Sequence, residues 1–315
     1  MKKLTRDQAV GYEFAKKDPL LRVRLGEVFE VETEDADNGC IRTNDDRLPP
    51  SAHFNPVAGP VHVEGAKRGD ILVVDIKEVV PVQDGHTLIM ETGHPLEDSA
   101  RWPECRGPYV HMIKQVPGPS GTMSDGTAIF NEKLSWKLHP FIGTMGVAPD
   151  NAIESGADSC IGQGPWGGNL DSRDFCKDSK VMFPVYHEGG LLFVGDVHGS
   201  MADTEFTGVA NETRANVLLS CDIIEKKSIP FVRVETADSI IQLNSSRPLE
   251  QAITQAFLWL MEWLITDYGM RPRDAYLNMS VNPYVKVNVY QMVKLNRLEY
   301  TVGAQFPKAH LLKQT

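Results

Sequence analysis

Short runs of apolar, often β-branched residues bounded by Gly, Pro or Asp dominate this chain. Runs of this kind are typical of β-strands. The pattern predicts strands over residues 71–76, 79–82, 181–186, 191–194, 216–223, 231–235 and 285–289. Gly-Asp before Ile71 and Gly-Gly before Leu191 predict tight turns into two of them, because glycine adopts positive φ without steric cost.

One late segment has the period of a helix instead. Between residues 248 and 268, apolar side chains recur at steps of three and four: Ile253, Phe257, Leu260, Met261 and Leu264. This stripe predicts a helix packed on a sheet and stopped by Gly269. A second helix is expected from Arg273 to about Ser280, with Pro272 in its first turn.

The strands are not interleaved with regular crossover helices, which argues against a doubly wound parallel sheet and favours a β-rich α+β fold. The 315 residues exceed the length at which one core usually stops growing. We therefore expect a β-rich part over residues 1–150 and an α+β part over residues 151–315 that carries the site. The boundary is soft, and a single intertwined domain is the alternative.

Composition excludes some classes of partner. The chain has 32 basic and 42 acidic residues, a net charge of −10 that argues against binding nucleic acid or an anionic membrane. The N-terminus reads as a short polar helix or tail and lacks the apolar stretch of a signal peptide. The most apolar window, residues 256–265, is interrupted by Glu262 and is shorter than the ~20 residues of a membrane span.

Five scattered cysteines without a C-x-x-C pair predict reduced thiols in a cytoplasmic protein. Either of two, Cys160 and Cys176, is a conceivable nucleophile, although neither lies in a glycine-rich turn. Inert buried thiols are the more ordinary interpretation.

The densest chemistry lies in residues 195–205, which read GDVHGSMADTE. Asp196 and His198 are two apart, so in an extended chain they point to the same side. Asp203 and Glu205 repeat this spacing. Two such pairs joined by a small-residue loop can close around one divalent cation, and Asp171 after the Gly-Gly-Asn turn can add a further oxygen.

Histidine with carboxylates is typical of catalytic zinc, although calcium or another divalent ion also fits. A bound cation lowers the pKa of water and polarises a carbonyl, which suits amide hydrolysis. Without metal, the same residues would form an acid–base pair. Asn169 can donate to a substrate oxygen or simply shape its own turn.

Other features are more ambiguous. His53 and His62 are either ligands or hydrogen-bonded structural residues, and the role of His139 stays open. Residues 137–149 (KLHPFIGTMGVAP) read as a loop whose glycines allow close backbone approach, or as closely packed strand.

Several segments together resemble the acetamidase/formamidase family. Residues 55–70 (NPVAGPVHVEGAKRGD) are similar to its N-P-x-T-G-P-x-Y/V-x-G-A-x-P-G-D motif. The resemblance continues, in the same order, through IGTMGVAP (142–149), GGNLD (167–171), GDVHGSMADTE (195–205) and the segment from Asp274 to Ser280.

The resemblance implies a β-rich α+β fold with mixed sandwich- or barrel-like sheets, homo-oligomers, a divalent metal such as zinc, and hydrolysis of short-chain amides to acid and ammonia. The six residues that fall on the family's polar positions are Asn169, Asp171, Asp196, His198, Asp203 and Glu205. The hypothesis is that Asp171, Asp196 and His198 hold the ion and that Glu205 transfers the proton. Asp203 would support His198 or the ion, and Asn169 would stabilise the oxyanion.

The chain also departs from the family pattern. Ala202 and Thr204 stand at small positions and are expected to crowd the pocket, Trp166 precedes Gly-Gly-Asn, and the tail 284–292 (YVKVNVYQM) differs from the usual G-D-L/F-x-I/V-x-Q. These departures leave the substrate open. They also motivate an alternative from another class, a non-catalytic small-molecule-binding or assembly protein.

Overall fold

The computed structural model describes residues 1–8, 11–90, 102–294 and 298–311, which form three sheets and a few short helices. The largest sheet has the order β1-β3-β15-β5-β13-β16-β17-β19-β18. All its neighbours are antiparallel except β1 and β3. Its strands are β1 (Lys2–Leu4), β3 (Phe29–Thr33), β15 (Ala215–Ile224), β5 (Ile71–Pro81), β13 (Lys180–Pro184), β16 (Arg233–Glu235), β17 (Ser239–Ser246), β19 (Tyr300–Pro307) and β18 (Lys286–Gln291).

The two smaller sheets complete the β-structure. The six-stranded sheet contains, in order, β11 (Gln163–Gly164), β12 (Gly167–Asn169), β10 (Phe141–Val147), β14 (Leu192–His198), β4 (Val57–Val63) and β2 (Leu21–Val23). The four-stranded sheet contains β6 (Gly85–Ile89), β7 (Tyr109–Val116), β8 (Thr127–Ile129) and β9 (Ser135–Lys137).

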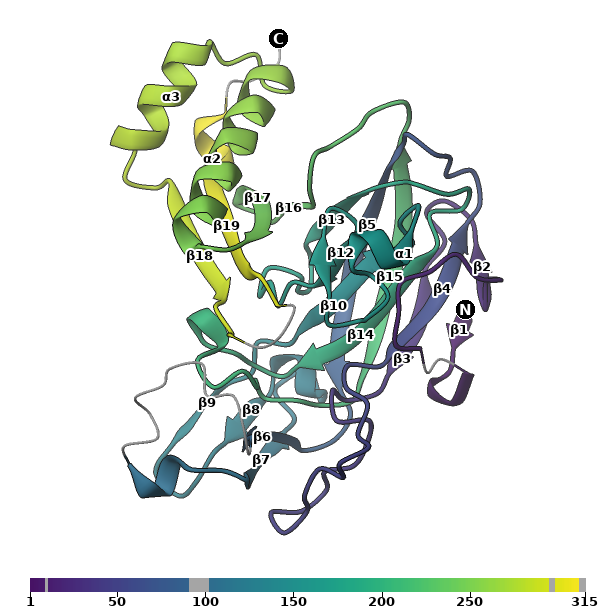
Figure 1. Ribbon diagram of the computed structural model, residues 1–315, viewed down its shortest axis with the longest axis vertical. Helices are drawn as coiled ribbons and strands as arrows, with labels where there is room; N and C mark the ends of the chain where they lie inside the picture. Colours follow the sequence, from purple (N-terminus) through teal and green to yellow (C-terminus); the bar gives the residue numbers. More distant parts are fainter. Residues whose placement is uncertain (9–10, 91–101, 295–297, 312–315) are drawn as a thin grey trace.

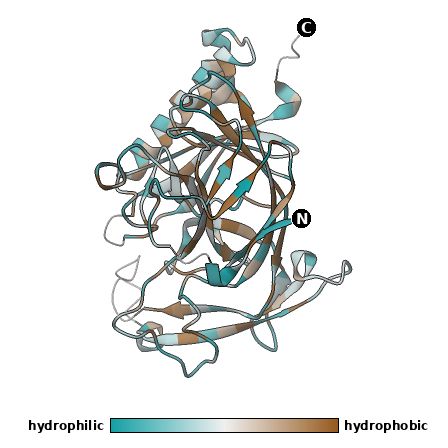
Figure 2. Cartoon of the chain, turned by 90° about the vertical axis from the view of Figure 1, so that its right-hand side faces the viewer, coloured by the Kyte–Doolittle hydropathy of each residue, from teal (hydrophilic) through white to brown (hydrophobic). Residues whose placement is uncertain are grey.

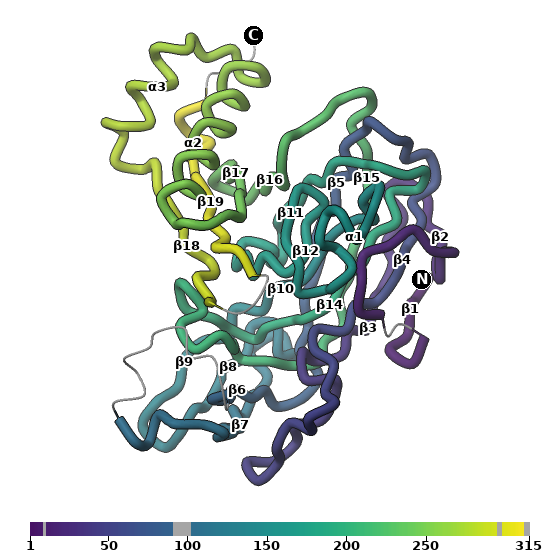
Figure 3. Tube along the Cα trace, viewed as in Figure 1, coloured from purple at the N-terminus to yellow at the C-terminus, as the bar shows by residue number. Residues whose placement is uncertain are grey.

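The α-helices of the described residues are α1 (Ala152–Ser155), α2 (Leu249–Thr266) and α3 (Pro272–Val281). Single 3₁₀ turns include Arg6–Gln8, Pro103–Cys105, Met123–Asp125, Asp203–Glu205 and Lys308–His310. In Figure 1, α2 and α3 stand with β17–β19 at one end of the molecule and β6–β9 form the opposite end. Figure 3 shows the other strands of the two larger sheets lying side by side, and they come from early (purple and blue) and late (green) parts of the chain.

One apolar core joins the two larger sheets. Val74 of β5 and Val181 of β13 belong to the same buried cluster as Val61 of β4, Met145 of β10 and Val194 of β14. Both β10 and β14 are buried along their whole length. Figure 2 shows the hydrophobic stretches lying mainly on strands rather than on the connecting loops. Strands buried on both faces read as continuous apolar runs, which explains why their pattern does not alternate.

The predicted β-rich α+β class is confirmed, and the structure sharpens several element predictions. The runs 71–76 and 79–82 belong to one strand, β5. Residues 2–4 form a strand rather than a polar helix or tail, because they pair with β3. Residues 141–147, interpreted as loop or as closely packed strand, form the central strand β10.

The division at residue 150 cuts through shared sheets. In the largest sheet, β5 from the first part lies between β15 and β13 from the second. In the six-stranded sheet, β10 lies between β12 and β14. Consequently, residues from either side of position 150 reach the same interior.

Both predicted helices are present. Helix α2 buries Ala256, Leu260 and Trp263 and packs on β17 and β19, forming a second apolar cluster apart from the main core. Gly269 lies beyond its end in the left-handed region (φ +66°), where Met270 N–H donates to Leu264 O. Pro272 opens α3, as the sequence predicted.

Substitution of one buried residue of α2 tests this packing. Leu260→Ala is expected to lower the free energy of unfolding by about 2–5 kcal/mol, because it leaves a cavity between α2 and the sheet. Leu258→Ala on the exposed side of the same helix should change it by less than about 0.5 kcal/mol. Urea unfolding compares the two variants, and equal losses would contradict the described packing.

Candidate active site

Strand β14 carries two of the predicted site residues near its C-terminal end. Asp196 and His198 are 2% and 1% exposed, and His198 Nε2 lies 3.2 Å from Asp196 Oδ1. Both lie inside the strand rather than after it, because β14 pairs with β10 as far as His198 opposite Phe141. The Phe141 ring packs edge-on against the imidazole, with ring centroids 4.9 Å apart.

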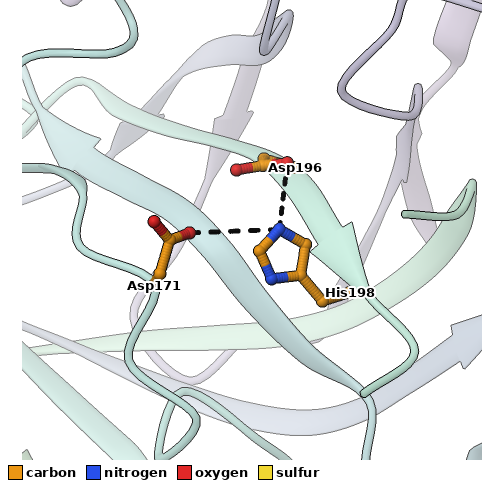
Figure 4. A group of neighbouring side chains, drawn as sticks. All are labelled: Asp171, Asp196 and His198. Atoms are coloured by element: carbon orange, nitrogen blue, oxygen red, sulfur yellow. Dashed lines mark hydrogen bonds and ion pairs between the residues drawn. The ribbon is translucent and has the colours of Figure 1, made fainter. Parts of the chain in front are cut away.

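Asp171 reaches the same point from the opposite side of β10. Its Oδ1 lies 3.9 Å from His198 Nε2 (Figure 4), and its side chain is buried. The preceding Gly-Gly-Asn segment is strand β12 rather than a flexible turn, since Gly168 pairs with Met145 of β10. The structure thus brings Asp171, Asp196 and His198 together.

Two glutamates add to this cluster. Glu212 Oε2 lies 3.4 Å from His198 Nε2, and Ala210 N–H donates to Glu212 Oε1 at 2.8 Å. Glu205 is also buried, and ligand atoms of His198, Glu205 and Glu212 lie within 4.8 Å of one another. The sequence analysis predicted Glu205 but missed Glu212, which belongs to no recognised spacing and is brought beside His198 by an antiparallel backbone bridge.

Asp203 lies outside the cluster, contrary to its predicted supporting role. Its side chain is 65% exposed and forms an ion pair with Arg173. The two-residue spacing places side chains together only in an extended chain, whereas Asp203–Glu205 form a 3₁₀ turn. Thr204 (φ +71°) and Glu205 (φ +47°) bend the backbone here, and Glu205 is buried whereas Asp203 is exposed.

Three polar side chains hold the second oxygen of Asp196. Asn55 Nδ2 and Thr144 Oγ1 each donate to Asp196 Oδ2 at 3.0 Å. The Asn169 amide, oriented with its NH₂ group toward the carboxylates, also lies 3.0 Å from this oxygen. Asp196 Oδ1 is left to face His198. Neither Asn55 nor Thr144 was singled out beforehand, although Asn55 opens the N-P-x-x-G-P segment and Thr144 lies in IGTMGVAP.

A glutamine from β18 bridges Asp171 and Glu205. Gln291 Nε2 donates to Asp171 Oδ2 and lies 3.4 Å from Glu205 Oε2. Its own oxygen accepts a hydrogen bond from Gln163 Nε2 at 2.8 Å, which fixes the amide orientation. Gln291 comes from the far edge of the largest sheet, so the segment YVKVNVYQM, noted beforehand only for its departure from the family pattern, supplies a site residue.

Burial and mutual repulsion set the charges of this cluster. Removal from water and the neighbouring Glu205 hold the pKa of Asp171 well above its usual range. Burial, opposed by His198 and reinforced by Glu212, raises the pKa of Glu205 to about 8. Burial alone would lower the pKa of His198, but the carboxylates of Asp196, Asp171 and Glu205 raise it to about 9.

The donor set suits a divalent cation. Two overlapping groups, Asp171–Asp196–His198 and His198–Glu205–Glu212, each place their ligand atoms within 4.8 Å of one another. Glu212 Oε2 is buried without a hydrogen-bond partner, which is costly for a carboxylate unless a positive charge is close. Carboxylate oxygens with one imidazole match zinc and other divalent ions.

The other residues considered as ligands or nucleophiles lie elsewhere. His53 packs on Tyr12, His62 on Gly189, and His139 Nε2 lies 3.3 Å from Arg173 O. Burial raises the pKa of Cys160 to about 12 and that of Cys176 to about 11, so both thiols are poor nucleophiles. None of these residues belongs to the metal-ligand groups found among the described residues.

The fold, the buried acid–histidine cluster and the comparisons with known proteins agree. The family model described as the Acetamidase/Formamidase family matches residues 15–160 and 139–303. An acetamidase of Mycolicibacterium smegmatis is 28% identical over 95% of this chain and 83% of its own length. A formamidase of Methylophilus methylotrophus is 30% identical over 59% of this chain and 56% of its own length.

Solved structures give the same result. The crystal structure of an acetamidase from Yersinia enterocolitica superposes with a TM-score of 0.86 at 29% identity, covering 99% of this chain and 93% of the other. A predicted acetamidase/formamidase from Thermoanaerobacter tengcongensis gives 0.85 at 28% identity, with 98% and 96% covered. These findings define an amidohydrolase. The chain belongs to the acetamidase/formamidase family.

Close packing around the acids leads to a first test at the site. A Cβ on Gly143 would lie 2.7 Å from Asp171 Oδ1 and 2.9 Å from Asp196 Oδ2. Gly143→Ala should therefore displace both carboxylates and lower activity about tenfold or more. Gly11→Ala, where the nearest atom would lie 3.4 Å away, is the matched control. Equal kcat/KM in both variants would show that the carboxylates are not held as described.

The shifted pKa values predict how stability changes with pH when chelator keeps the protein free of metal. Glu205 has a pKa of about 8 in the folded chain and 4.5 ordinarily, so its contribution falls as pH rises from about 4.5 to 8. His198 has a raised pKa of about 9, and its contribution is present below 6.5 and lost as pH rises through 9.

Both groups act in the same direction, so Tm in chelator should fall between pH 6 and pH 9. Glu205→Gln should flatten this profile, because it removes one of the two groups. A Tm that rises over this interval in the metal-free protein would contradict the described electrostatics.

Proposed function

We propose that this protein hydrolyses the C–N bond of a small linear amide of the formamide or acetamide kind to a carboxylic acid and ammonia, with a bound divalent cation. The observation that carries the proposal is the buried convergence of three carboxylates on His198 Nε2, at 3.2, 3.4 and 3.9 Å. Relatives named acetamidase and formamidase supply the amide chemistry.

Asp171, Asp196 and His198 are the proposed ligands. When bound, the cation polarises the amide carbonyl and acidifies water. Zinc is the proposed ion because carboxylates with an imidazole suit it, and a set this rich in carboxylates makes calcium the main competitor. Glu212 lies on the other side of the imidazole and offers a further oxygen.

Glu205 is proposed as the proton carrier. Its raised pKa places it close to the range in which a carboxyl can accept and return a proton near neutral pH. It would take a proton from the attacking water and deliver it to the departing nitrogen as the C–N bond breaks. Gln291 orients both Glu205 and Asp171 for these tasks.

Asn169 lines the cavity beside the acids, but its amide is engaged by Thr144 and Asp196. In this arrangement it positions the carboxylates, and its role as an oxyanion donor stays a prediction. Cytoplasmic location and homo-oligomeric assembly also stay predictions of the sequence. No helix among the described residues has both the length and the apolarity needed to cross a bilayer.

The non-catalytic alternative rested on three departures from the family pattern. Trp166 is buried in the main core, and neither Ala202 nor Thr204 is among the described residues that line the cavity at the acids. The departures therefore leave the acid–histidine cluster intact, which favours the enzyme.

Metal content and ammonia release from formamide and acetamide test the proposal. His198→Ala should lose the metal and reduce turnover at least about a hundredfold, because the ion loses its only imidazole ligand in the proposed set. Glu205→Gln should retain metal and lose turnover about as strongly.

Asp203→Asn is the matched control, since this carboxylate comes from the same turn but points to solvent. It should keep both metal and activity. Unchanged turnover in His198→Ala, or an equal loss in Asp203→Asn, would refute the proposed roles.

A further inference from the structure

The cavity at the acid–histidine cluster is larger than formamide or acetamide requires. Its volume is about 490 Å³. Pockets of ~300–1,000 Å³ hold drug-sized ligands, whereas acetamide has only a handful of non-hydrogen atoms. Most of this space therefore lies beyond the reacting amide group.

The cavity has two chemically different parts. Asp196, His198, Glu205 and Glu212 form its polar end. Eight of the other lining residues are apolar, and four of these pack in one small cluster: Leu48, Leu88, Met90 and Val209. We call these four residues the apolar wall.

The apolar wall does not belong to the main core. Its cluster centres on Ile41, Leu88 and Val110, and it joins β6 and β7 of the four-stranded sheet to the segments that contain Leu48 and Val209. Leu88 is buried, with 5% of its surface exposed, whereas Leu48, Met90 and Val209 are partly exposed. Apolar side chains left accessible in a cavity are a binding surface for an apolar group.

Charge determines how an amide is oriented in the cavity, that is, whether its nitrogen or its acyl chain lies at the polar end. The departing nitrogen develops positive charge as it gains a proton and the C–N bond breaks, so it is favoured beside the carboxylates. An acyl chain carries no charge and gains by leaving water, so it is favoured against the apolar wall. A chain that ends in a carboxylate would lose its hydration there without a partner.

We propose that the substrates of this enzyme are neutral primary amides whose acyl chain is longer than acetyl and lies against Leu48, Leu88, Met90 and Val209. This inference rests on the proposed amide hydrolysis and specifies the substrate class of the same site. Each methylene that leaves water on the apolar wall is worth up to about fourfold in affinity.

Ammonia release from a homologous series tests the inference in the unmodified enzyme. The series is formamide, acetamide, butyramide and hexanamide, with succinamate as the charged counterpart of butyramide. We expect kcat/KM to rise along the series, about threefold or more per added methylene pair, chiefly through a lower KM. Succinamate should be hydrolysed at least about tenfold less efficiently than butyramide.

A variant localises the effect to the apolar wall. Leu48→Ser should lower the ratio of kcat/KM for hexanamide to kcat/KM for formamide about tenfold. Leu134→Ser, an exposed leucine between β8 and β9 that does not line the cavity, should alter neither. Because the chain-length series needs no substitution, the inference stays testable if Leu48→Ser does not fold.

The outcomes separate the two claims. Hydrolysis of formamide and acetamide with no gain for longer chains would overturn the substrate class and leave the proposed function standing. No ammonia from any amide in the metal-loaded enzyme would overturn the proposed function and this inference together.

Discussion

The crowding of four buried carboxylates around one imidazole is the constraint on which the rest of this structure depends. Asp171, Asp196, Glu205 and Glu212 are each 7% exposed or less, and all of them approach His198. Like charges in a medium of low polarity repel strongly, so such a cluster persists only with positive charge and hydrogen-bond donors inside it. The carboxylates raise the pKa of His198 to about 9 against the effect of burial, so the imidazole of the metal-free protein is expected to carry a balancing proton at neutral pH.

The side chains that donate hydrogen bonds to these acids come from distant parts of the chain. Asn55 precedes β4, Thr144 is on β10 and Gln291 ends β18, yet all three contact the acids. Interleaving of early and late strands in the two larger sheets makes this possible, because it brings distant segments to one interior. The late helix α2 contributes indirectly, since it packs on β19, the strand that pairs with β18.

Local patterns predicted the parts of the structure that depend on local geometry. Both long helices follow from apolar spacing and from the positions of Pro272 and Gly269. The two-residue spacing predicted that Asp196 and His198 lie together, and they do within β14, although Asp196 itself has φ +54° and is not extended. The same rule was wrong for Asp203, because a 3₁₀ turn replaces the strand there.

Local sequence patterns could not predict contacts between residues that are far apart in the chain. Glu212 meets His198 through a backbone bridge, and Gln291 meets Asp171 across 120 residues. No spacing in the sequence encodes either approach. Residues 141–147 were ambiguous for a related reason: a strand with both faces buried shows no alternation, and its glycines resemble those of a loop.

Four residues of the site hold their backbone in the left-handed region, where L-amino acids are disfavoured: Asn55, Asp171, Asp196 and Glu205, with φ between +47° and +54°. Asn and Asp tolerate this conformation better than Glu does. Each strained residue costs folding energy that surrounding contacts must offset. Selection for heat resistance alone would therefore favour glycine at these positions, and would remove side chains of the proposed site while relieving backbone strain.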